Sequence, residues 1–357
     1  MISLVLLTLL CAQAISPAPD VAVFDTGRQN QMAVTFSPDG ETAFWVTWNG
    51  QWGSQGERRT IVTSRWADGR WTRPGPVPFS SEYDDDDPFV SPDGRWLYFV
   101  STRPPDVDSE ETEGDIWRYR LEEPERLERL TLNSDAAEYS PVVTSNGTLY
   151  FASARKGGYG QGDLYRAERL GEEFAAPEAL GPALNHATGE WNLWVSADET
   201  EIIFEASSRA SNITQSGDLY YSWRTSLGWS PAMPIEELNS AGSDLMPRLH
   251  PNGSRLYYTT APIGGHARLA TVDWRSLRAD IRARSYPPLI VANRSSHEVA
   301  IVDLARGIVT SRIATGEGPH LLSNVAGQRV VATGYGEFPE PHDEPVLSVR
   351  TAGERDR

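Results

Sequence analysis

A four-residue turn recurs five times at nearly constant spacing. It reads Ser-Pro-Asp-Gly at residues 37–40 and 91–94, and it recurs in altered form at 144–147, 196–199 and 250–253. The fourth residues of the turns are 40, 94, 147, 199 and 253, so the steps are 54, 53, 52 and 54 residues. Self-similarity at such a long period is typical of an array of repeated supersecondary units.

One repeat, residues 82–134, shows what each unit is built from. We expect strands at 87–90, 96–100, 114–119 and 126–130, joined by tight turns or polar loops. The second of these, Trp-Leu-Tyr-Phe-Val, is almost wholly apolar, which favours burial on both faces. Because a single four-stranded antiparallel sheet cannot bury both faces, the repeats predict a ring of such sheets, an all-β propeller.

Several landmarks recur in step with the turn. Gly-Asp-Leu-Tyr stands at 162–165 and 217–220, and Leu-Asn-Ser at 132–134 and 238–240. Together with the Pro-Asp-Gly turns, residues 30–274 resemble the propeller repeats of TolB-like periplasmic proteins. The resemblance implies a single β-propeller of four-stranded antiparallel blades, six in number, with seven as the alternative. Such repeats occur in binding scaffolds and in propeller domains attached to peptidases, so the resemblance does not decide the function.

The C-terminal part has a different sequence pattern. It is similar to the YVTN propeller repeat at residues 289–293, at 298–303 and in the Gly-Glu-Gly-Pro-His run at 316–320. We interpret 15–274 as five propeller blades, 275–285 as a linker and 286–357 as the closing blade with a disordered tail. The strand expected at 21–24 would pair into that blade. The alternative is a second repeat domain that is cut short.

The N-terminal segment predicts export. Residues 1–14 combine an apolar run with the small-x-small pattern Ala-Gln-Ala, which reads as a signal peptide cleaved after Ala14. Leu9 and Leu10 before the only cysteine, Cys11, argue against a lipoprotein. We expect a periplasmic or secreted monomer that does not span the membrane. A net charge of −17 disfavours nucleic-acid binding.

Aligning the repeats on the turn exposes an acidic column. Nine residues before the fourth turn position stand Gln31, Asp85, Glu138, Glu190 and Asp244. We expect these side chains near the mouth of the central channel, where clustered carboxylates would attract a cation or a cationic partner segment. The alternative is that each carboxylate caps the backbone of a neighbouring blade. Trp191 lies beside Glu190 and could belong to a platform for a sugar or a peptide.

The four consecutive aspartates at 84–87 form the densest cluster of negative charge in the sequence. A calcium site at Asp84, Asp85 and Asp86 is one hypothesis, although the run lacks the glycine and the distal glutamate of a calcium loop. A solvated charge run is the other. Ca²⁺ is the one cofactor considered.

No sequence pattern for a catalytic serine or a zinc site stands out, and we assign no catalytic residue. The leading hypothesis is therefore an exported, non-enzymatic propeller that binds a protein or cell-envelope ligand at one face or at the channel mouth. The alternative is a propeller lyase or hydrolase with a divalent cation on the channel carboxylates. A third hypothesis is a sensor or assembly fragment of a larger system.

Overall fold

The computed structural model describes residues 15–349 except 52–56, 81, 107, 111, 124, 226–227, 286–288, 294–297, 304–307, 315–318, 326–328 and 335–345. The predicted signal peptide thus lies outside the described residues. The chain divides into two compact units, residues 1–277 and 278–357. This division falls inside the helix α1 (Trp274–Ser285), close to the predicted boundary at 274/275.

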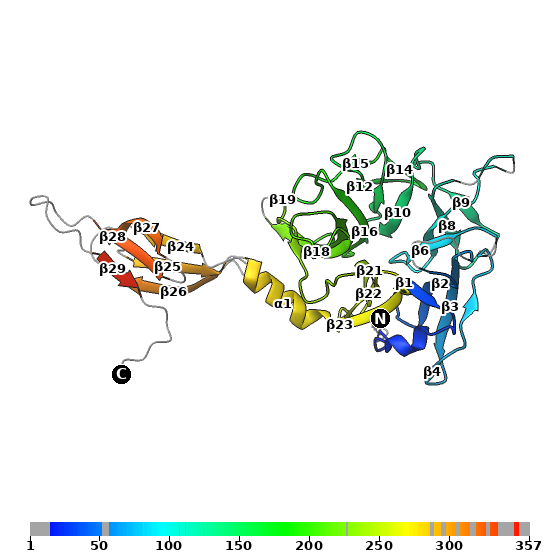
Figure 1. The fold of residues 1–357 in the computed structure, drawn as a ribbon, viewed down its shortest axis with the longest axis horizontal. Coiled ribbons are helices and arrows are strands. Elements are labelled where there is room, and N and C mark those ends of the chain that lie inside the picture. The colour runs from blue at the N-terminus through cyan, green and yellow to red at the C-terminus, as the bar shows by residue number, and fades with distance from the viewer. Residues whose placement is uncertain are drawn as a thin grey trace, which may run out of the picture. The chain divides into compact units, whose positions relative to one another are not determined.

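The first unit consists of five antiparallel sheets arranged around a central axis (Figure 1). Blades 1 and 2 consist of β1 (Asn30–Phe36), β2 (Thr42–Trp48), β3 (Thr60–Ala67), β4 (Arg70–Trp71) and β5 (Gly75–Pro76), and of β6 (Asp85–Val90), β7 (Trp96–Ser101), β8 (Asp115–Arg120) and β9 (Leu127–Arg129). Blade 3 consists of β10 (Glu138–Val143), β11 (Leu149–Ser153), β12 (Asp163–Ala167) and β15 (Glu178–Ala179), with a separate small hairpin of β13 (Arg169–Leu170) and β14 (Glu173–Phe174). Blades 4 and 5 consist of β16 (Gly189–Val195), β17 (Glu201–Ser207), β18 (Gly217–Thr225), β19 (Gly228–Trp229) and β20 (Met233–Pro234), and of β21 (Ser243–Leu249), β22 (Arg255–Ala261) and β23 (Arg268–Asp273). The four strands predicted for residues 82–134 are confirmed.

The hydrophobic core lies between neighbouring blades. Every residue of β7 and of β11 is buried, as expected for a second strand that is apolar on both sides. One core cluster joins Val46 of blade 1, Phe99 of blade 2 and Leu245 of blade 5. The blades therefore stabilise one another by burying apolar faces that a lone sheet would expose.

Five blades are detected, one fewer than the six predicted. In four of the five blades, a backbone N–H of the first strand donates to a backbone carbonyl of the neighbouring blade. The N–H groups of Asp85, Glu138, Glu190 and Gln31 donate to the carbonyls of Arg59 (3.1 Å), Gly114 (2.9 Å), Gly162 (2.9 Å) and Ala267 (3.1 Å), respectively. The last of these bonds connects blade 1 to blade 5. The ring thus closes on itself with the same bond that its other blades use.

The segment at 21–24, expected as a strand, is instead the 3₁₀ helix η1 (Val21–Phe24). Asp20 caps it by accepting the Ala22 N–H at 3.0 Å, which favours a helical turn over an extended strand. Phe24 is buried against Trp45 of blade 1 and Tyr257 of blade 5, with ring centroids 5.2 and 5.8 Å away. The N-terminal segment therefore packs across the closing junction without adding a strand.

The recurring turn has one structural role in all five blades. The N–H of its fourth residue donates to the carbonyl of its first at 2.8–2.9 Å, and that fourth residue lies in the left-handed region. Glycine suits this conformation, yet blade 4 has Glu199 there with φ +58°. The carboxylate of Glu199 accepts bonds from Thr144 (2.9 Å) and Tyr150 (3.0 Å) of blade 3, which accounts for a side chain at this position.

The described residues of the second unit form two three-stranded antiparallel sheets. The strands are β24 (Leu289–Asn293), β25 (Glu298–Asp303), β26 (Ile308–Ala314), β27 (Pro319–Val325), β28 (Arg329–Gly334) and β29 (Val346–Val349). The assignment of this segment to a closing blade stays a prediction. The predicted linker at 275–285 is helical, and the predicted tail lies outside the described residues.

Candidate functional site

The acidic column lies at the start of the first strand of each blade, but its side chains are buried. Asp85, Glu138 and Glu190 are 0% exposed, and Asp244 is 1% exposed. A carboxylate so far from water needs partners within the protein. Three of the four have an arginine of their own blade.

Each of these arginines follows the end of the second strand. Arg103 lies 2.7 Å from Asp85, Arg155 lies 2.9 Å from Glu138 and Arg209 lies 2.8 Å from Glu190. The same guanidinium also donates to a backbone carbonyl of the segment that enters the blade, at Phe79, Leu132 or Leu184. One cation thus ties together three parts of the chain in each of blades 2, 3 and 4.

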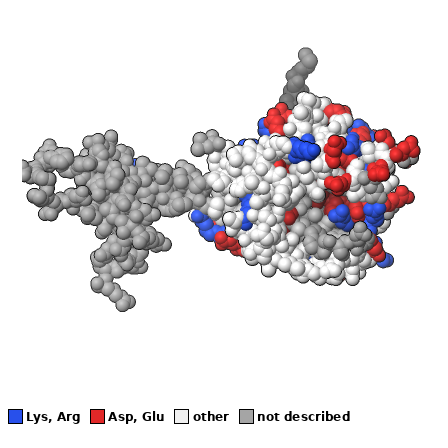
Figure 2. Space-filling view, turned by 45° about the horizontal axis from the view of Figure 1, so that its top comes forward, with Lys and Arg blue, Asp and Glu red and all other residues white. Residues whose placement is uncertain are grey.

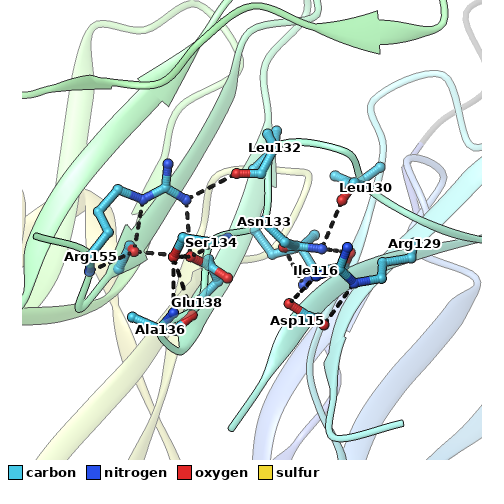
Figure 3. Close-up of polar contacts among 11 residues, drawn as sticks. Asp115, Ile116, Arg129, Leu130, Leu132, Asn133, Ser134, Ala136, Glu138 and Arg155 are labelled. Carbon is cyan, nitrogen blue, oxygen red and sulfur yellow. Dashed lines mark hydrogen bonds and ion pairs between the residues drawn. The ribbon is translucent and has the colours of Figure 1, made fainter. Parts of the chain in front are cut away.

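Figure 3 shows this arrangement in blade 3. Glu138 Oε1 accepts bonds from the Ser134 N–H (3.2 Å), the Ser153 hydroxyl (3.1 Å) and Arg155 (2.9 Å). Next to it, the Asn133 side chain accepts from the Ile116 N–H at 2.8 Å and donates to the Ile116 carbonyl at 3.0 Å. Asn185 and Asn239 repeat these two bonds, so the Leu-Asn landmark clamps the third strand of its blade.

The arginines also contact aromatic rings. The Arg209 guanidinium lies 5.2 Å from the Phe204 centroid and 4.7 Å from that of Tyr220, and Arg155 lies in the same way over Phe151 and Tyr165. Such cation–π contacts stabilise a charge that is removed from water. Sequence reasoning missed these residues, although Ser-x-Arg recurs at 101–103, 153–155 and 207–209 and could have indicated them.

Blades 1 and 5 depart from this pattern. Blade 1 has the neutral Gln31 in the column, and blade 5 has the exposed Ile263 where the others have arginine. Asp244 accepts the Ser240 N–H at 2.6 Å, and its Oδ1 has no hydrogen-bond partner among the described residues. As ligand-binding residues, the four acids of the column stay a prediction; their described contacts are with groups of the protein itself.

The aspartate run is divided among several partners. Asp84 pairs with Arg58 and Arg59 at 3.4 and 3.5 Å, and Asp86 pairs with Arg59 at 2.9 Å, whereas Asp85 faces Arg103. Within the part of the chain that the structure describes, no group of three His, Cys, Asp or Glu side chains could hold a metal ion. Calcium binding at Asp84, Asp85 and Asp86 stays a prediction.

Polar groups from three blades are joined at the inner strands. Asp87 accepts the Ser140 N–H of blade 3 at 2.9 Å, and the Ser140 hydroxyl donates to Asn192 of blade 4 at 3.1 Å. Asp87 and Ser140 lie at β-bulges with φ +48° and +45°. From blade 5, the buried Arg248 donates to Leu193 of blade 4 and lies 5.6 Å from the Phe89 ring of blade 2.

Two buried carboxyl groups close to this network have pKa values near neutrality. Burial raises the pKa of Glu205 to about 7, and the charges of Asp87, Asp218 and Asp244 add to that effect, whereas the bond from Asn192 opposes it. Burial likewise raises the pKa of Asp86 to about 7, against the attraction of Arg59. These two carboxyl groups, buried within the propeller, therefore change their protonation state near neutral pH.

Trp191, the aromatic member of the predicted site, is half-buried at the start of β16. Its ring lies against the backbone of Gly162 and Gly189, so that a Cβ on either glycine would come within 2.5 Å of it. Its Nε1 donates to Ser207 at 3.2 Å, and the Tyr139 ring meets it edge-on at 5.4 Å. Trp191 is therefore held in one orientation by two blades.

The fold is that of a β-propeller. Among solved structures, the chain is similar to TolB from Acinetobacter baumannii, with 18% identity over 70% of this chain and 53% of that one and a TM-score of 0.48. This chain thus spans about half the length of TolB.

Two further similar structures are a periplasmic gluconolactonase of Pseudomonas aeruginosa (15% identity, 89% of this chain and 84% of that one, TM-score 0.39) and the hydrazine synthase of Kuenenia stuttgartiensis (14%, 92% and 97%, 0.39). No protein-family model and no curated protein matches the chain. These TM-scores lie below 0.5, so the likenesses do not bear on what this chain does. Among the described helices, none is long and apolar enough to cross a membrane.

Proposed function

We propose that this protein is an exported, non-enzymatic β-propeller that binds a protein or envelope-associated ligand at the face where the first strands begin. The proposal of export rests on the signal-like sequence of residues 1–14. The observation that carries the binding proposal is the Tyr139–Trp191 pair. Both rings are half-buried at this face, and neither belongs to the fully buried core.

The aromatic pair suits recognition because it is rigid before any ligand arrives. Trp191 is fixed by Ser207 and by the glycines beneath it, so binding would cost little side-chain entropy. Partly exposed Trp and Tyr side chains supply much of the binding energy in protein interfaces. The buried carboxylates of the column, by contrast, would each stabilise their own blade while the aromatic rings meet the ligand.

Charge favours a partner with basic groups. The loop at 102–114 follows Ser101, which pairs with Asp85 at the start of β6, so this loop lies at the same end of blade 2 as the column. It carries the exposed acids Asp106, Asp108, Glu110 and Glu113. Figure 2 shows acidic side chains, with basic ones among them, on the visible face of the first unit. Such a field would attract a basic segment and speed its association.

Replacing Trp191 by alanine should weaken partner binding about a hundredfold, the effect of removing a central aromatic contact. The mature chain, residues 15–357, would be immobilised and exposed to envelope extract of the producing cell, and retained proteins, peptides and glycans would be quantified. Trp66→Ala is the matched control, since Trp66 is 38% exposed in β3, at the end of the strand that pairs with β4.

The proposal predicts that the control retains the same ligand as the wild type and that Trp191→Ala does not. Equal retention by both variants would place binding elsewhere, and no retention by the wild type would overturn the binding role. Circular dichroism of both variants would verify that the fold is intact.

A further inference from the structure

A cleft of about 260 Å³ lies at the junction of blades 5 and 1, against η1. Its apolar wall comes from Val21, Phe24 and Leu269, and its polar wall from Arg28, Gln31 and Arg268. Ligand pockets usually combine an apolar lining with a few polar groups, and this volume, just below their usual range of about 300–1,000 Å³, suits a ligand of few heavy atoms. The cleft contains neither Tyr139 nor Trp191, so it is a separate site from the aromatic pair, although Gln31 places it at the same end of the blades.

The side chains that line this cleft include more positive than negative groups. Two guanidinium groups line it, against one carboxylate, Asp25, which is exposed and accepts the Gly27 N–H at 2.8 Å. Arg28 donates to the Thr47 carbonyl at 3.1 Å and pairs with the exposed Glu57 at 3.3 Å. Arg268 donates to the carbonyl of Ala267 and, unlike Arg28, forms no ion pair with an acid among the described side chains. Arg268 therefore supplies an unpaired positive charge at the cleft.

The column residue at this place is the one that lacks a charge. Gln31 lines the cleft where four other blades have a carboxylate, and a carboxylate there would repel an anion. Its Nε2 donates to the Arg28 carbonyl at 2.7 Å, which holds the backbone of that arginine against the cleft. The neutral Gln31 and the two arginines thus all favour an anion over a cation in the cleft.

We propose that this cleft binds a small organic carboxylate with an apolar body. The carboxylate binds Arg268, whose planar guanidinium group suits paired bonds to carboxylate oxygens, and Arg28 lies beside it on the same wall of the cleft. The apolar body packs on Phe24 and Leu269. The bound molecule bridges η1, blade 1 and blade 5, and therefore stabilises the junction that closes the ring.

Calorimetric titration of residues 15–357 with sodium 3-phenylpropionate and sodium hexanoate tests this proposal. The neutral analogue 3-phenylpropan-1-ol and inorganic phosphate serve as comparison ligands. We expect at least one of the two carboxylates to bind, and the alcohol and phosphate to bind about tenfold more weakly or not at all. No binding of either carboxylate at millimolar concentration, or equal binding of the alcohol or of phosphate, would overturn the proposal.

Two variants locate the site. Arg268→Gln and Gln31→Glu should each weaken carboxylate binding about tenfold. Gln31→Glu introduces the residue type that other blades carry at this position, and thermal melting shows whether it folds. Arg169→Gln changes an exposed arginine of blade 3 and should leave binding unchanged. Unchanged binding in both Arg268→Gln and Gln31→Glu would place the carboxylate elsewhere and overturn the assignment.

Discussion

Replacing Arg209 by methionine should lower the free energy of unfolding by about 3–5 kcal/mol, because the Glu190 carboxylate would stay buried without its cation. Arg209 is 8% exposed and Glu190 is not exposed at all. Methionine keeps most of the apolar contact with Phe204 and Tyr220, so the loss reports the charge rather than a cavity. Chemical denaturation at pH 7.5 measures the change.

The exposed pair of Arg166 and Glu178, 3.2 Å apart, gives the matched control. Arg166→Met should change the stability by less than about 1 kcal/mol, as is usual for exposed ion pairs. The loss in Arg209→Met should also shrink at acidic pH, since protonation of Glu190 removes the unpaired charge. A loss as small as that of the control would show that the buried pair does not hold blade 4 together.

The second large effect concerns pH. The pKa of Glu205 is raised to about 7 in the folded protein, whereas a glutamate in an unfolded chain titrates near 4.3. The folded state therefore binds this proton more tightly, so stability is fully present below about pH 4 and falls as the pH rises toward 7. Above pH 7 to 8 the term is constant.

Glu205→Gln removes this titration and keeps an oxygen that can accept the Asn192 bond, 2.5 Å long in the wild type. Relative to the wild type, the variant should gain about 2–4 kcal/mol of stability between pH 4.5 and pH 8.5. Denaturation of both proteins across this range measures the difference, and taking the difference cancels the titration of Asp86, which is common to both. Parallel stability curves would show that Glu205 titrates normally.

Much of the fold could be predicted because the sequence repeats its turns. The turns placed the strands of residues 82–134, and the apolar run at 96–100 identified a strand buried on both faces. The number of blades was harder to predict. Ring closure depends on a backbone bond from Gln31 to Ala267, and no residue type marks such a bond. Blade 5 also has only three strands, after which the chain enters α1.

The residues of the acidic column were found from the sequence, but their surroundings were not. Alignment on the turn shows which acids share a position, yet it does not show whether they face a channel or an arginine. Arg209 lies 19 residues after Glu190, and only the pairing of β16 with β17 brings the two side chains together. Likewise, the apolar letters of 21–24 suggested a strand, whereas the Asp20 cap and the packing of Phe24 make it a helical turn.

A double-mutant cycle on Glu190 and Arg209 tests the central claim, that each carboxylate of the column, through its arginine, holds together the strands and the entry segment of its own blade. The cycle compares Glu190→Gln, Arg209→Met and the double variant by chemical denaturation. We predict a coupling energy of about 2–3 kcal/mol, against less than about 0.5 kcal/mol for the corresponding cycle on Glu178 and Arg166. Equal coupling in the two cycles would contradict the account.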